Sequence, residues 1–76
     1  MIFFKKKQEI EVGGMGRTGC EQKVEKALKE IPEVITAKAD HKTGKAVITS
    51  KEGVSEEKVK AAIESVNKTY LGIKDL

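Results

Sequence analysis

Two sulfur-containing side chains, Met15 and Cys20, lie in and directly after the glycine-rich stretch Gly13–Gly19. Sulfur ligands suit soft cations such as Cu(I), and a cysteine binds metal as the thiolate. If a helix begins at this stretch, its exposed backbone N–H groups favour that thiolate. Cys20 is the only cysteine of the 76 residues, so one chain offers a single thiolate. The candidate chemistry is therefore a metal site that Cys20 shares with a second chain, or the chemistry of a reactive thiol.

The only histidine, His41, lies in the polar segment Asp40–Lys45. A lone histidine among polar residues is interpreted most simply as a turn residue. The alternative is a metal site formed by His41 and Cys20, for which two turns far apart in the sequence have to meet within bonding distance.

Other chemistries receive little support from the sequence. The glycine-rich stretch has the composition of a phosphate-binding loop but lacks its Gly-Lys-Ser/Thr ending, so we do not expect nucleotide binding. Anion capture by Arg17 and the start of the helix stays open. Since no grouping of acid, base and nucleophile can be located, we predict that the protein is not an enzyme.

The amino-acid composition and the charge of the chain limit the kinds of partner that we expect. The formal net charge is +3 with both signs interspersed, and three aromatic residues are too few for base stacking, so we expect no nucleic-acid partner. The apolar residues 1–4 are too short for a membrane span and do not resemble a secretory signal. We expect residues 1–5 to extend a strand or fray, with a membrane foothold or dimer contact as the alternative. The prediction is a single domain over residues 1–76, in the cytoplasm.

Helix and strand signals alternate along the chain. Glu9–Val12 alternates polar and apolar residues, as a half-buried strand does. Thr18 and Glu21 form a capping box at the start of a helix that ends before Pro32, and Ser55 caps a second helix. The further strands that we predict are residues 34–39, 46–49 and 70–73.

The order strand-helix-strand-strand-helix-strand predicts an α+β, ferredoxin-like βαββαβ two-layer sandwich, with two helices on one face of an antiparallel sheet. In this fold the segments 13–20, 40–45 and 67–70 share one end of the molecule. We call it the loop end and expect any site there. The side chains expected to be buried are those of Ile10, Val12, Val24, Leu28, Val47, Val59, Ile63 and Val66, with Met15 beneath the loop.

The stretch Gly14-Met15-Gly16-Arg17-Thr18-Gly19-Cys20, followed by Val24-Glu25-Lys26-Ala27-Leu28, resembles the metal loop and first helix of the heavy-metal-associated domains. This family contains small copper chaperones and modules of copper-pumping ATPases. Its loop is Gly-Met-x-Cys-x-x-Cys. With Met15 aligned, Cys20 takes the place of the second cysteine and Arg17 the place of the first. The resemblance extends from about Ile10 to Ile73.

The resemblance also implies roles for residues around the loop. Gly14 and Met15 would support the loop, with Met15 packed beneath it, and Tyr70 would correspond to the aromatic residue that closes over it. The alternative for Tyr70 is a half-buried strand residue with its hydroxyl in water. Basic residues near the loop would dock an acidic partner, such as a domain of a metal-transport ATPase; the matching residues are Arg17, Lys42, Lys45 and Lys68. The alternative is that these charges are simply solvated.

Three functional hypotheses follow. The first is a copper or heavy-metal chaperone-like protein with an altered loop, in which Cu(I) or another soft ion is held by Cys20 shared with a second chain, as in a homodimer, or with a partner. The second is a metal-free interaction module that docks an acidic partner through Arg17 and the lysines. The third is a thiol-redox protein that uses Cys20 alone. An inert cysteine left from a two-cysteine parent is the plain alternative to all three.

Overall fold

The computed structural model describes residues 6–16 and 18–76 of the 76-residue chain. The expectations for residues 1–5 and for Arg17 concern residues that lie outside the described part of the chain. Six elements follow one another in the predicted order: β1 (Lys6–Gly13), α1 (Thr18–Lys29), β2 (Val34–Asp40), β3 (Lys45–Ser50), α2 (Glu56–Ser65) and β4 (Thr69–Asp75).

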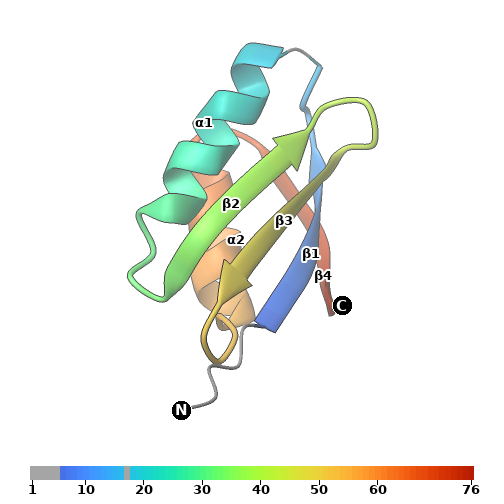
Figure 1. Cartoon of the computed structure of the whole chain (residues 1–76). Helices are drawn as coiled ribbons and strands as arrows, with labels where there is room; N and C mark the ends of the chain where they lie inside the picture. Colours follow the sequence, from blue (N-terminus) through green and yellow to red (C-terminus); the bar gives the residue numbers. More distant parts are fainter. Residues whose placement is uncertain (1–5, 17) are drawn as a thin grey trace.

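The four strands form one antiparallel sheet in the order β2-β3-β1-β4, so β2 and β4 are its edges. Figure 1 shows both helices packed on one side of this sheet, with β1 and β4 behind β3 in that view. The predicted ferredoxin-like sandwich is confirmed. A register shift between Glu11 and Val12 opposite β4 is the main irregularity of β1.

Alternation along the strands decides which side chains enter the core. Ile10, Ala46 and Ile48 are fully buried against the helices, as the two-residue period of a strand requires. Val47 was expected in the core, and that prediction was wrong. It lies between Ala46 and Ile48 in β3, so its side chain points to the opposite, open face and is only half-buried.

The two helices close the core from one side. In α1, Val24 and Leu28 are fully buried and one turn apart, and the helix ends at Lys29, before Pro32. Ser55 caps α2 as predicted, because its side chain accepts a hydrogen bond from the backbone N–H of Lys58 at 3.4 Å.

Burial in and beyond α2 agrees with the remaining core predictions, with one exception. Val59 and Ile63 are fully buried, and Val54, just before the helix, is buried beside them. Val66 was expected in the core but is half-buried, because it follows the last helical turn and packs at the margin of the cluster. Among the described helices, neither is long and apolar enough to cross a membrane.

Candidate metal-binding loop end

Strand pairing brings three segments together at the loop end, at the top of Figure 1. Gly13 pairs with Thr69, and Glu11 pairs with Lys45. The backbone N–H of Val12 donates to the carbonyl of Gly44 at 2.8 Å, which ties the β2–β3 hairpin to the end of β1. The predicted meeting of the segments 13–20, 40–45 and 67–70 is therefore confirmed.

Glycine is required at one bend of this end. Gly44 has φ +70°, and a Cβ there would lie 3.4 Å from the carbonyl oxygen of Val12. An L side chain is strained at such a φ, so Gly44 lets the hairpin approach β1 closely.

The two sulfur-containing side chains differ in burial. Met15 is buried and belongs to the core cluster, in agreement with a packing role beneath the loop. Cys20 lies in the first turn of α1, half-buried, and packs against that cluster from its margin. The loop therefore carries one sulfur inside the core and one at the surface of the loop end.

Glu21 joins α1 to the hairpin through His41. Its Oε2 accepts a hydrogen bond from the backbone N–H of His41 at 2.6 Å and lies 2.6 Å from the ring Nδ1. Because an ionised carboxylate can only accept, Nδ1 carries the proton of the second contact. The capping box predicted from Thr18 and Glu21 involves the Thr18 side chain, which lies outside what the structure describes, so it stays a prediction. Oε2 of Glu21 turns to the hairpin, where it receives two donors of one residue.

These contacts hold Glu21 ionised. The hydrogen bond from the His41 backbone holds the pKa of Glu21 below its ordinary value of 4.5, and the ring contact and the nearby Lys42 charge act in the same direction, while burial opposes them. Charge-assisted bonds of this kind are stronger than neutral ones. The site thus holds a fixed negative charge one residue from Cys20.

Asp40 completes a group of three side chains of the types that can bind a metal ion. Its Oδ1 accepts a hydrogen bond from the backbone N–H of Lys42 at 2.8 Å. One ligand atom each of Glu21, Asp40 and His41 lies within 4.8 Å of the others. The structure therefore brings His41 to the loop end beside two carboxylates, and Cys20 is not a member of this group.

A second carboxylate of α1 repeats the contact one turn later. Oε2 of Glu25 accepts a hydrogen bond from the backbone N–H of Ala39 at 2.8 Å. Glu21 and Glu25 are four residues apart and so share a helix face, and they take the N–H groups of two alternate residues at the end of the edge strand β2. The hairpin is therefore fixed to α1 as well as to β1.

Tyr70 lies where β4 begins, opposite Val12, and is half-buried. Its hydroxyl is buried, so the alternative with the hydroxyl in water was wrong. Burial raises the pKa of the Tyr70 hydroxyl, and the Glu56 carboxylate raises it further. No well-formed hydrogen bond joins that hydroxyl to another described residue.

The residues considered for partner docking have different surroundings. Lys42 is exposed on the hairpin, and the side-chain stem of Lys68 lies 3.6 Å from where a Cβ of Gly14 would be. Lys45 instead forms an ion pair with Glu9 at 3.2 Å on the open face of the sheet. Lys42 and Lys68 are thus the docking candidates that the structure shows at the loop end.

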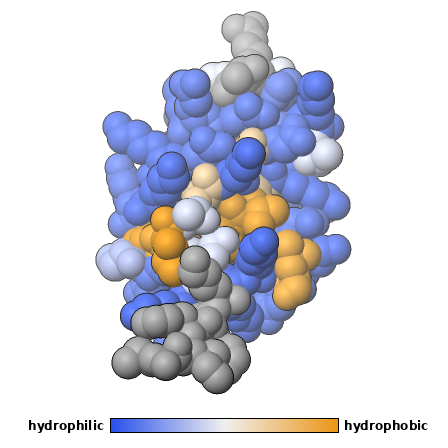
Figure 2. Space-filling model, viewed as in Figure 1, coloured by the Kyte–Doolittle hydropathy of each residue, from blue (hydrophilic) through white to orange (hydrophobic). Residues whose placement is uncertain are grey.

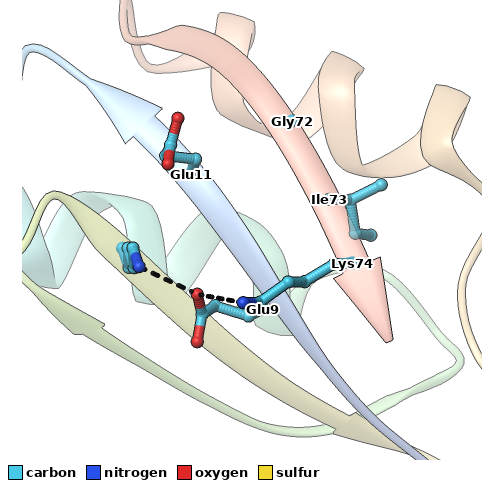
Figure 3. A pocket seen from close by; sticks show the side chains of 6 residues that line it. Glu9, Glu11, Gly72, Ile73 and Lys74 are labelled. Carbon is cyan, nitrogen blue, oxygen red and sulfur yellow. Dashed lines mark ion pairs between the residues drawn. The ribbon is translucent and has the colours of Figure 1, made fainter. Parts of the chain in front are cut away.

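The open face of the sheet has a hollow of its own, next to Gly72 (Figure 3). Glu9 lies at its centre, between Lys45 and Lys74, whose amine is 3.8 Å from the Glu9 carboxylate. Glu11 also lines the hollow, so its two carboxylates and two amines sum to zero net charge, and the hollow has no net charge with which to attract a ligand.

Sequence reasoning missed Glu21 and Asp40 as site residues. The signal was present, because the fold predicted that the segments 13–20 and 40–45 meet, and Glu21 directly follows the first. It was assigned to the helix cap instead. Figure 2 shows that the upper, loop end is mostly hydrophilic in this view, while the stronger apolar colour lies lower down.

A ferredoxin-like sandwich that presents a Gly-Met loop and a cysteine at the start of its first helix has the architecture of small metal-binding domains. The family model described as "Heavy-metal-associated domain" matches residues 9–69. The chain belongs to the heavy-metal-associated domain family.

Solved structures of the same fold support this assignment. The protein described as "CopZ metallochaperone" is 26% identical, with a TM-score of 0.79 over 86% of this chain and 98% of that one. The copper-binding domain of HMA7, a P-type ATPase, is also 26% identical, with a TM-score of 0.77 over 93% of each chain.

A third neighbour shows the fold alone. The N-terminal domain of a potential copper-translocating P-type ATPase from Bacillus subtilis is 21% identical, with a TM-score of 0.80 over 96% of this chain and 95% of that one. No curated protein sequence matches the chain significantly. The chain thus resembles both metallochaperones and the metal-binding domains of P-type ATPases.

Proposed function

We propose that this protein is a chaperone-like heavy-metal-associated domain protein that holds a soft ion, such as Cu(I), with Cys20 and a thiolate from a second molecule. The observation that carries the proposal is the place of Cys20, in the first turn of α1 and next to the loop that contains the buried Met15. One chain supplies one thiolate, so the second thiolate has to come from another copy or from a partner.

Low coordination suits transfer of the ion. A soft cation held by one thiolate from each of two molecules can stay with either molecule when the two separate. The shared site would therefore also allow the ion to pass from one molecule to the other. The positive charge of Arg17, at the position of the first family cysteine, opposes a cation on an isolated chain. Binding by one chain alone is therefore expected to be weak.

A partner with an acidic surface fits the lysines at the loop end. Lys42 and Lys68 lie there, and Arg17 belongs by sequence to the loop before α1. A partner of opposite charge would meet this end of the protein faster. One neighbour is a metallochaperone and another is a domain of a P-type ATPase, so a metal-transport ATPase domain is the partner class that we propose.

The deciding experiment is an anaerobic Cu(I) titration of the reduced protein against a competing chelator, with mass spectrometry under native conditions. We expect one Cu(I) per two chains, and we expect Cys20→Ser to abolish it. If wild type and Cys20→Ser bind alike, the shared-thiolate proposal is wrong, and a metal-free interaction module becomes the better account.

Arg17→Cys tests whether the remainder of the loop still supports metal. This variant restores two cysteines at the family spacing, so we expect tight binding of one Cu(I) per chain, in the same chelator competition. Arg17→Ser is the matched control, because it removes the same positive charge without adding a thiol. If Arg17→Cys binds no better than Arg17→Ser, the loop does not position two thiolates.

A further inference from the structure

We propose that Glu21, Asp40 and His41 form a second cation site, separate from Cys20 and suited to a borderline divalent ion such as Zn(II). The site would lie between the first turn of α1 and the β2–β3 hairpin. It takes nitrogen and oxygen ligands, whereas the proposed Cu(I) site takes sulfur. The inference does not depend on whether Cys20 binds metal.

The first argument is geometric. One ligand atom of each residue lies within 4.8 Å of the others. Ligands of a tetrahedral Zn(II) bind at about 2.0–2.2 Å and so lie about 3.3 Å apart. Glu21 Oε2 and His41 Nδ1, at 2.6 Å, have to separate slightly, and the Asp40 oxygen has to approach. Small side-chain rotations provide both changes, since Asp40 is exposed and His41 half-buried.

The second argument is that backbone contacts hold the ligands without using up their binding capacity. The backbone N–H of His41 anchors the Glu21 carboxylate, and the backbone N–H of Lys42 anchors Oδ1 of Asp40. Each carboxylate has a second oxygen and further lone pairs for a metal. Outer hydrogen bonds of this kind orient metal ligands and raise affinity.

The third argument concerns charge and the proton. The cation takes the place of the proton between His41 Nδ1 and Glu21 Oε2, and this proton goes to the solvent. Two carboxylates and a neutral imidazole compensate a divalent ion, and water fills the remaining coordination position. A monovalent soft ion gains less, because it prefers sulfur to these ligands.

Lysines around the site act against the cation. Lys42 is close enough to affect Glu21, and Lys38 and Lys45 line the same hollow as Glu21 and Asp40. Lys45 is engaged by Glu9, which leaves Lys38 and Lys42 as exposed opposing charges, and of these two it is Lys42 whose charge acts on Glu21. Lys42→Gln is therefore expected to bind the ion more tightly than wild type.

The test is titration of the wild-type protein, and in parallel of Cys20→Ser, with Co(II) as a spectroscopic probe and with Zn(II) in competition. We expect one ion per chain, ligand-field bands, and no sulfur-to-cobalt charge transfer. His41→Ala and Asp40→Asn are each expected to weaken binding by about tenfold or more. Glu33→Gln is the matched control, since it removes an exposed carboxylate that pairs with Lys58 away from the site.

Wild-type protein provides a measurement that no folding defect can affect. Paramagnetic Co(II) should broaden the amide resonances of residues 40–42 and 21 first and leave those of residues 33 and 58 sharp. If broadening is uniform, or if His41→Ala binds as wild type does, the proposal is overturned. Loss of Co(II) binding in Cys20→Ser would also overturn the site of Glu21, Asp40 and His41, but it would support a metal site at Cys20. The second cation site and the Cys20 site can therefore fail independently of each other.

Discussion

The two ends of the sandwich use polar side chains in different ways. At the far end, around Gln8, Ser50 and Asp75, the polar groups hold loops in place. At the loop end, Glu21, Asp40 and His41 also hold a hairpin, but they stay partly exposed and keep ligand capacity. Both ends pack against the same hydrophobic core.

The far end shows what a purely structural polar cluster is like. Oε1 of the buried Gln8 accepts from the backbone N–H of Val54 at 2.8 Å, and its amide group lies 3.3 Å from Oδ1 of Asp75. The fully buried Ser50 accepts from the N–H of Gly53 at 2.9 Å. Gln8 and Ser50 satisfy neighbours of fixed position from within the core, whereas Asp75 is exposed and pairs with Lys6. The comparison teaches that two acids clustered with a histidine, rather than polarity or exposure by itself, mark the end at which to seek chemistry.

The largest expected effect comes from the core on which both ends depend. Leu28→Ala removes a fully buried side chain of α1 and should lower the free energy of unfolding by about 2–5 kcal/mol. Urea unfolding measures the loss. Hydrogen exchange of the Ala39 and Val54 amides should become faster together, one from each end. Separate behaviour of the two amides would mean that the ends do not share one cooperative unit.

A pair of substitutions compares the ends directly. Gln8→Leu leaves the buried backbone groups of Val54 without partners and should cost about 1–3 kcal/mol. Glu21→Gln should cost less, because water reaches the Glu21 contacts and an amide can still accept a bond from His41. Equal losses in urea unfolding would contradict the distinction between the two ends.

The smallest expected effect is a pH dependence at the far end. A contact with Lys6, at 3.0 Å, holds the pKa of Asp75 below its ordinary value of 3.8. Asp75 therefore stabilises the fold above that value, and its contribution disappears as the pH falls through the lowered pKa. The stability difference between wild type and Asp75→Asn should shrink over that acidic range. A difference that stays constant with pH would show that the Lys6 contact contributes nothing.

The fold could be predicted because its local signals agree with one another. Alternation in β1, the break at Pro32 and the cap at Ser55 fix the order of elements, and the order leaves few topologies. Val47 was misplaced because valine was taken as a sign of the core, whereas its neighbours Ala46 and Ile48 fix which face it shares.

The candidate site could be predicted only in part. The topology predicted that the loop and the hairpin meet, which placed Cys20 and His41 at the same end. The contact between Glu21 and His41 depends on the rotation of α1 and on the length of the hairpin, to within a few ångströms. Neither follows from periodicity, and the capping box offered Glu21 a local partner of equal plausibility.

The carboxylates that α1 places on β2 have a consequence for self-association. Unpaired strand edges are templates for the addition of further strands. Glu25 and Glu21 already take the N–H groups of Ala39 and His41, at one end of the β2 edge. A second copy that extended the sheet would meet this obstacle at β2 and not at β4. Joining through β4 would leave two partly obstructed edges outside, which would disfavour growth of the sheet beyond a pair of chains.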